Sequence, residues 1–198
     1  GKAWLTHIGD SRIYMVRNGK TILLTLDHSR VFKMIEAGMI TEEQAEDHPM
    51  GHILERSIGS SDVVEVDVRA DSVELCQGDA LVLCTDGFWS MVKEEEMTRL
   101  FSVGDLREGV QSGIDLALER GADDNTTVGV LRVESGAVTA PEVIDVREAL
   151  YARVRREKAR REEEKVAKAK ITEPVMGVES IGTGTNPLLG SVSPEKKL

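Results

Sequence analysis

The dipeptide Asn18-Gly19 stands between two strand-like runs, and it limits the fold of this chain more than any other feature of the sequence. Asn-Gly at the centre of a two-residue loop is the strongest short-range signal for a β-hairpin, because both positions must adopt a positive φ angle. Residues 12–17 and 21–26 should therefore pair as antiparallel strands. Residues 3–8 read as a further strand, which ends at the turn Gly9-Asp10-Ser11.

The remaining elements follow from apolar periodicity and from capping signals. Residues 62–69 alternate valines with acidic residues, which is typical of a strand, and residues 80–84 form a continuous apolar run of the buried-strand type. A last β-branched strand is expected at 126–133. Helices are expected at 29–37, after the capping-box pattern Thr41-Glu42-Glu43-Gln44, at 93–101 and at 105–119. Hairpins followed by helices predict an α+β fold with antiparallel sheets.

The composition and the periodicity of the sequence change near residue 137. We expect one domain over residues 1–136, and a linker with a charged helix over residues 137–170, where apolar residues first recur at helical spacing and then give way to Arg, Lys and Glu. The bases of this helix could bind anionic lipid or nucleic acid, but the interleaved acids favour a plain solvated helix. Residues 171–198 lack periodicity, and we expect a disordered tail.

Charge and cysteine content exclude several classes of protein. The net charge is −10, and residues 1–140 alone hold 13 Lys/Arg against 25 Asp/Glu, which argues against nucleic acid as the main partner. No apolar run of about 18 residues is present, so no membrane insertion is expected. Cys76 and Cys84 lie in apolar stretches without metal-site spacing. Free thiols of this kind indicate a reducing compartment, and we expect a cytoplasmic protein.

Three aspartates lie where a predicted strand meets a turn. Asp10 follows the first strand, Asp86 follows the buried run at 80–84, and Asp124 precedes the last strand. A rigid sheet could hold several such carboxylates at one edge, where they would form an oxygen-rich site for a hard cation such as Mg²⁺ or Mn²⁺. Each one taken alone is more often a turn former than a ligand. The residues by themselves leave the two readings open and name no reaction.

Several short motifs, taken in their order and spacing, indicate more about function than the three aspartates do. They are Gly9-Asp10-Ser11-Arg12, Leu26-Asp27-His28-Ser29, Glu36-Ala37-Gly38-Met39-Ile40-Thr41, His48-Pro49, Leu54-Glu55-Arg56-Ser57-Ile58-Gly59, Gly78-Asp79, Leu83-Cys84-Thr85-Asp86-Gly87-Phe88-Trp89 and Asp124-Asn125-Thr126-Thr127-Val128. Collinear over about 130 residues, they resemble the protein phosphatase 2C (PPM) family of serine/threonine phosphatases. The resemblance implies a sandwich of two antiparallel sheets flanked by helices (α-β-β-α), incomplete here at its N-terminus.

The resemblance also implies a reaction and its cofactors. Family members hold two Mn²⁺ or Mg²⁺ ions, and a third in some cases, between the sheets. The two ions share a water that attacks phosphoserine or phosphothreonine in proteins, since two metals can activate the water and neutralise the phosphate together. The implied partners are phosphorylated proteins, targets of serine/threonine kinases in signalling. A monomer is expected.

Residue by residue, the resemblance assigns roles to seven positions of this chain. Asp86 and Asp124 would be metal ligands, and Asp10 would bind the third, weaker ion together with Asp86. Asn125 would orient its neighbours near the phosphate, and Gly87 would belong to the residues that surround the substrate and the metal ligands. Ser11 and Arg12 would stabilise the turn rather than contact substrate. His48 or His52 could serve as a general acid, although neither is favoured.

The chain also departs from the family pattern. The Asp-Gly pair that bridges both ions and the Arg that binds the substrate phosphate are expected before Gly1, because the chain opens without Met and directly in a strand. Position 90 is Ser where family members usually have Asp. We therefore expect the full-length protein to be active and this stretch alone to be inactive.

Two other functions are alternatives to a phosphatase. The first is a degenerate phosphatase-like module that binds a partner without catalysis; retention of all three aspartates argues against it. The second is a metal nuclease built on the same acids, which the negative charge of residues 1–140 disfavours.

Overall fold

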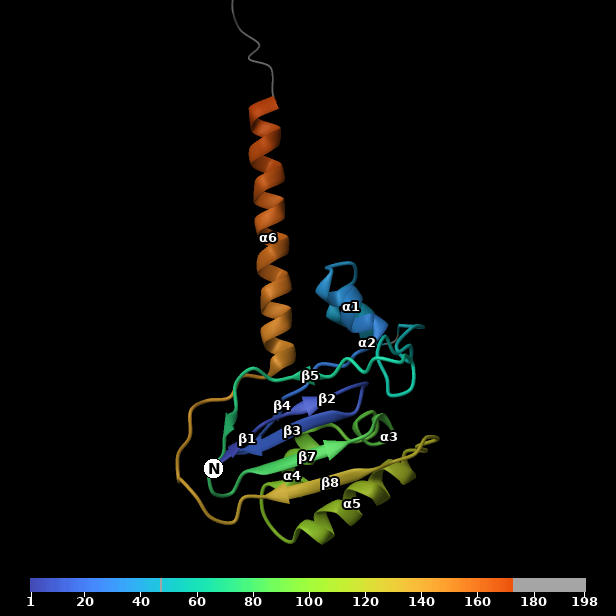
Figure 1. Ribbon diagram of the computed structural model, residues 1–198, viewed down its shortest axis with the longest axis vertical. Helices are drawn as coiled ribbons and strands as arrows, with labels where there is room; N and C mark the ends of the chain where they lie inside the picture. Colours follow the sequence, from blue (N-terminus) through green and yellow to red (C-terminus); the bar gives the residue numbers. More distant parts are fainter. Residues whose placement is uncertain (47, 173–198) are drawn as a thin grey trace, which may run out of the picture. The chain divides into compact units, whose positions relative to one another are not determined.

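The computed structural model describes residues 1–46 and 48–172, and every pairing between its named strands is antiparallel (Figure 1). The elements, in chain order, are β1 (Lys2–Ala3), β2 (Thr6–His7), β3 (Arg12–Arg17), β4 (Lys20–Leu23), α1 (Arg30–Glu36), α2 (Glu42–Glu46), β5 (Asp67–Val68), β6 (Val73–Glu74), β7 (Ala80–Cys84), α3 (Asp86–Trp89), α4 (Glu94–Phe101), α5 (Leu106–Glu119), β8 (Val128–Arg132) and α6 (Val146–Thr172). The predicted α+β class with antiparallel sheets is confirmed.

A four-stranded sheet in the order β4-β3-β7-β8 forms the centre of the fold (Figure 1). The β3–β4 hairpin turns at Asn18 and Gly19, whose φ angles are 50° and 72°. Two successive positive φ angles define the type I′ turn that the Asn-Gly signal predicted, because the twist of this turn matches the twist of paired strands. The continuous apolar run forms β7, which lies between β3 and β8.

The two faces of this sheet bury two separate apolar clusters. One face packs against α3, α4 and α5, and its cluster contains Tyr14, Leu23, Val82, Phe88, Met97 and Phe101. The opposite face packs against the short two-stranded ladders β1–β6 and β2–β5, and its cluster contains Leu5, Ile13, Met15, Leu24, Val73 and Leu81. Side chains therefore alternate between the two clusters along β3 and β7, as the two-residue period of a strand requires.

The strand predicted over residues 62–69 is wrong except at β5. Only Asp67 and Val68 pair, with the two residues of β2, and the side chains of Val63 and Val64 are 72% and 50% exposed. An alternating sequence is stable as a strand when its apolar face packs on a second surface and its backbone finds a partner strand. Here the partner strand β2 is two residues long, so residues 62–66, before β5, have no described strand to pair with.

Capping side chains fix the short helices that follow β4. The Ser29 hydroxyl accepts the backbone N–H of Phe32 and begins α1. At α2, Thr41 and Gln44 exchange two hydrogen bonds, of 2.9 and 3.3 Å, between side chains and backbone N–H groups. This is the reciprocal capping box that the sequence predicted. The four-residue helix α3 was not predicted.

Helix α6 covers the predicted charged helix, but its first turns pack against the domain. The Asp145 carboxylate accepts the backbone N–H groups of Arg147 and Glu148 at the start of the helix and also that of Leu23 in β4 (2.7 Å). Leu150 is buried. The prediction of a wholly solvated helix is therefore wrong for these turns. Ile171 and Thr172 end α6, and the rest of the predicted tail lies outside the described residues.

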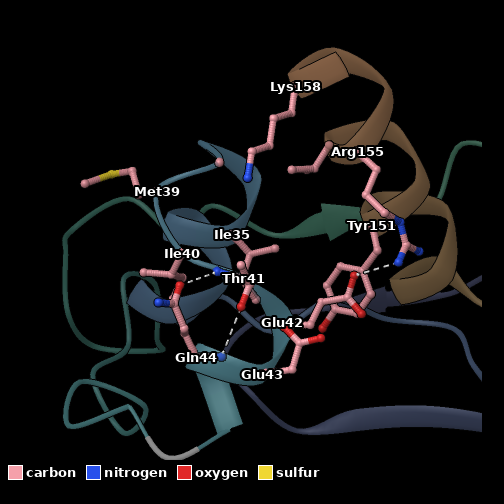
Figure 2. Close-up of a pocket in the computed structure, with 12 residues that line it drawn as sticks. Ile35, Met39, Ile40, Thr41, Glu42, Glu43, Gln44, Tyr151, Arg155 and Lys158 are labelled. Carbon is pink, nitrogen blue, oxygen red and sulfur yellow. Dashed lines mark hydrogen bonds and ion pairs between the residues drawn. The ribbon is translucent and has the colours of Figure 1, made fainter. Parts of the chain in front are cut away.

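A cavity of about 300 Å³ separates α6 from α1 and α2 (Figure 2). Arg155 of α6 forms an ion pair with Glu42 at 3.4 Å across it, and Tyr151 and Ile35 line it. The described helices, α6 included, lack an apolar stretch long enough to cross a bilayer.

A buried ion pair joins distant parts of this fold. The Arg17 guanidinium in β3 donates Nε–H to the Asp79 carboxylate at 2.7 Å and a second N–H to its other oxygen. The same guanidinium donates to the backbone carbonyls of Glu74 (2.7 Å) and Pro141 (3.1 Å). Burial alone would raise the pKa of Asp79, but the hydrogen bonds from Arg17 and from the Cys76 backbone N–H lower it.

We predict that Arg17→Met lowers the free energy of unfolding by about 3–5 kcal/mol, because the substitution leaves the Asp79 carboxylate buried without its counter-charge. Lys2→Met is the matched control. It removes an exposed ion pair with Glu74 at 3.9 Å and should cost less than about 1 kcal/mol. Urea unfolding at neutral pH measures both. Equal midpoints for the two variants would contradict a stabilising role for the buried pair.

Candidate metal centre

The strand register brings the three predicted aspartates to one end of the central sheet. Arg12, Cys84 and Val128 lie side by side on β3, β7 and β8, because Arg12 pairs with Cys84 and Cys84 pairs with Val128. Asp10 lies two residues before the first of these, Asp86 two residues after the second, and Asp124 four residues before the third. All three aspartates therefore lie at the same end of the sheet, where β3 and β8 begin and β7 ends.

Asp10 lies in the turn between β2 and β3 and is partly buried. Its backbone carbonyl accepts a hydrogen bond from the Trp89 indole N–H at 3.0 Å. Burial raises the pKa of the Asp10 carboxyl, and the nearby Asp86 carboxylate raises it further. Asp10 and Asp86 are thus close enough to repel each other, although 76 residues separate them in the chain.

Arg12 secures the end of the same turn. Its guanidinium donates two parallel hydrogen bonds to the Asp27 carboxylate, of 2.9 and 2.7 Å, and lies 3.5 Å from the centre of the Trp89 ring. A bidentate, stacked and largely buried arginine is strongly ordered. Its hydrogen-bonding capacity is directed to Asp27 and the Tyr14 hydroxyl.

Asp86 is the first residue of α3, directly after β7. Its Oδ1 accepts the backbone N–H of Gly87 at 2.9 Å, and its backbone carbonyl accepts the hydroxyl of Ser90. The side chain of Ser90, at the position where family members usually have Asp, therefore forms its hydrogen bond within the turn of α3. Gly87 is buried at the point where α3 approaches the loop that leads into β8.

Asp124 lies in that loop and is exposed. Its Oδ1 accepts the backbone N–H of Asn125 at 2.6 Å. The loop is tied to the end of β7 because the Thr85 hydroxyl donates to the Asn125 carbonyl at 3.0 Å and accepts the backbone N–H of Thr127 at 3.0 Å. The loops that carry Asp86 and Asp124 are therefore fixed to each other by hydrogen bonds.

The donor chemistry of this edge suits a hard cation. Among the described residues, no lysine, arginine or histidine forms an ion pair with Asp10, Asp86 or Asp124. Carboxylates that gather without basic partners are the ligands that Mg²⁺ and Mn²⁺ prefer. The three side chains do not, however, form a set whose oxygens all lie within 4.8 Å of one another in the described structure.

The set of three that does meet this distance in the described part of the chain is His7, His28 and Asp67. Its hydrogen bonds argue against a metal site. His28 Nδ1 accepts the backbone N–H of Gly9 at 3.2 Å, so the proton of the neutral ring is on Nε2, the atom that faces Asp67. A protonated nitrogen cannot ligate a metal.

The other histidines show local contacts. His48, one of the two considered as a general acid, accepts the backbone N–H of Met50 at 3.1 Å within its own turn. His52 is exposed.

A cavity of about 580 Å³, within the usual size range of ligand sites, borders the Asp10 turn and is lined by Arg12 and Trp89 as well as by residues of α1, α2 and α6.

We predict that Gly87→Ala lowers the free energy of unfolding by about 1–3 kcal/mol, because the added methyl group would lie 2.9 Å from the Asn125 carbonyl oxygen and the two loops must separate. The control is Gly129→Ala in β8, where no atom lies within 4 Å of the added carbon, and its effect should stay within about 0.5 kcal/mol. Urea unfolding compares the two. Identical midpoints would show that the loops are not in close contact.

No protein-family model matches the chain. Curated proteins of related sequence do match it. The chain is 45% identical over 130 residues to a putative protein phosphatase 2C-type of Streptococcus pyogenes, covering 65% of this chain and 52% of that protein. It is 34% identical over 129 residues to the serine/threonine protein phosphatase PstP of Mycobacterium tuberculosis, covering 65% of this chain and 24% of PstP. The chain thus spans about half the length, or less, of the curated relatives it matches.

Solved structures agree with these relatives. The serine/threonine phosphatase of S. agalactiae superposes with a TM-score of 0.63 at 39% identity, covering 67% of this chain and 55% of that one. The crystal structure of PstP from M. tuberculosis gives a TM-score of 0.62 at 33% identity, over 67% and 55% of the two chains. Sequence and fold lead to the same conclusion: the matched two-thirds of this chain belong to the PPM family, the protein phosphatase 2C-type serine/threonine phosphatases.

Proposed function

We propose that the protein containing this chain hydrolyses phosphoserine and phosphothreonine in other proteins, with Mn²⁺ or Mg²⁺ as cofactor. The observation that carries the proposal is the shared sheet edge of Asp10, Asp86 and Asp124, set by the register of β3, β7 and β8. The family relationship supplies the reaction class, since the relatives are named serine/threonine phosphatases.

Two findings support the choice of metal. One is the set of carboxylates without described basic partners. The other is a solved structure of the PstP catalytic domain in complex with two manganese ions, which superposes on 65% of this chain and 52% of that one with a TM-score of 0.53 at 31% identity. Bound ions would supply Lewis-acid activation of water and neutralise the charge of the phosphate.

The residues of this chain would hold and orient that centre. Asp86 at the start of α3 and Asp124 in the loop before β8 would be the ligands, and Thr85 joins the two segments by hydrogen bonds. Asp10 would share a weaker ion with Asp86, since burial and the nearby Asp86 carboxylate raise the pKa of the Asp10 carboxyl. Gly87 lets the loops approach closely, and Asn125 would lie beside the phosphate.

This chain would provide only part of the active site. The family pattern also requires an Asp-Gly pair and a phosphate-binding Arg that these 198 residues do not supply at the expected positions. We therefore propose that the chain alone does not catalyse hydrolysis. The free, buried thiols of Cys76 and Cys84 support action in the reducing cytoplasm, on targets of serine/threonine kinases.

We predict that Asp86→Asn and Asp124→Asn, made in the protein with a complete PPM domain, each lower kcat/KM for a phosphoserine peptide by at least roughly 100-fold. The reason is that losing even a hydrogen-bond partner of a metal ligand typically costs about 10- to 100-fold. Asp123→Asn, a neighbouring exposed acid in the same loop, is the control and should change kcat/KM by less than about 3-fold. The assay is Mn²⁺-dependent phosphate release.

The same assay separates the alternatives. Manganese-dependent hydrolysis by the 198-residue chain alone would contradict its proposed incompleteness. Phosphopeptide binding without any hydrolysis by the complete domain would instead identify a degenerate binding module.

A further inference from the structure

The turn that carries Asp10 is held at both ends by two consecutive residues, Asp27 and His28. Asp27 binds Arg12 after the turn through the bidentate pair described above. His28 binds Gly9 before it through both backbone polar groups: its own N–H donates to the Gly9 carbonyl at 2.8 Å, and its Nδ1 accepts the Gly9 N–H at 3.2 Å.

Gly9 needs such support because of its backbone conformation. Its φ angle is +93°, which other residues rarely adopt, and the residue is buried. A buried backbone N–H without an acceptor is costly, so the conformation of Gly9 depends on the acceptor that His28 offers. The direction in which Asp10 leaves the turn follows from the conformation of Gly9.

The imidazole itself is held in one protonation state by its surroundings. Its Nε2 lies 3.1 Å from Asp67 Oδ2, a contact with the length but not the direction of a good hydrogen bond, and Asp67 Oδ1 accepts from Arg56 at 2.8 Å. The ring is 4% exposed and packs on His7, with 4.4 Å between ring centres. Burial lowers the pKa of His28, which keeps Nδ1 free to accept.

We propose that His28 is a positioning residue for the metal centre: its Nδ1 fixes the Gly9 backbone and thereby the direction of the Asp10 carboxylate. The other ring nitrogen, Nε2, faces the Asp67 carboxylate, which Arg56 holds in place. His28 contacts neither metal nor substrate in this arrangement. The proposal rests on the proposed function for its consequence in catalysis, but its structural content concerns this chain alone.

Two substitutions separate the roles of the ring nitrogens. In His28→Asn the amide oxygen takes the place of Nδ1 and can still accept the Gly9 N–H, whereas in His28→Gln the amide reaches toward Asp67 and the Gly9 acceptor is lost. Hydrogen exchange of the Gly9 amide in the 198-residue chain should be roughly 5- to 10-fold faster in His28→Gln, the effect of losing one hydrogen bond. In His28→Asn it should change by less than about 3-fold.

The wild-type chain provides a test that needs no substitution. Long-range ¹⁵N–¹H spectra of the imidazole at neutral pH should show Nδ1 without a proton and Nε2 with one. The opposite tautomer would overturn the proposal, because Nδ1 could not then accept from Gly9. This measurement also decides the matter if His28→Gln does not fold, which thermal unfolding would reveal.

In the protein with a complete domain, the Mn²⁺ concentration for half-maximal phosphopeptide hydrolysis should rise roughly 10-fold in His28→Gln and less than about 3-fold in His28→Asn. Equal effects of the two variants, in exchange and in Mn²⁺ dependence, would overturn the positioning role. A wild-type domain without activity would refute the proposed function instead, and the exchange and tautomer measurements would still decide the role of His28.

Discussion

The buried ion pair between Arg17 and Asp79 connects three parts of the chain that are distant in sequence. Arg17 is the last residue of β3, Asp79 precedes β7, and the carbonyl of Pro141 belongs to the segment that leads to α6. A pair of this kind adds little net stability after desolvation, but it penalises other registers, in which one charge would be buried alone. The register of β3 against β7 in turn sets where Asp10 and Asp86 meet.

Elements with strong local signals were predicted correctly from the sequence. The Asn18-Gly19 turn requires two positive φ angles, β7 is continuously apolar, and α4 and α5 have apolar stripes that face the sheet. The strand over 62–69 failed because its pattern says nothing about the length of its partner, which is β2 with two residues. The packing of α6 was missed because its contacts, such as Asp145 with Leu23, are long-range and follow no periodicity.

The candidate site was predictable in part for the same reason. Asp10, Asp86 and Asp124 could be selected because each follows or precedes a strand, and the register places all three at one edge. The role of Arg12 in stabilising the turn was expected, but the partners that support the turn were not. Arg12 with Asp27, and Gly9 with His28, pair across a hairpin and a turn, and no spacing in the sequence indicates such pairs. The indole of Trp89 reaches Asp10 from 79 residues away.

The Asp145 carboxylate has an effect on the sheet that extends beyond starting a helix. One of its oxygens caps α6, while the other accepts the N–H of Leu23 on β4, one of the two outer strands of the sheet. Unpaired N–H groups on an outer strand invite other chains to add to the sheet and aggregate. A residue outside the strands therefore covers a backbone N–H of this outer strand, and a shorter fragment that ends before Asp145 would expose that N–H.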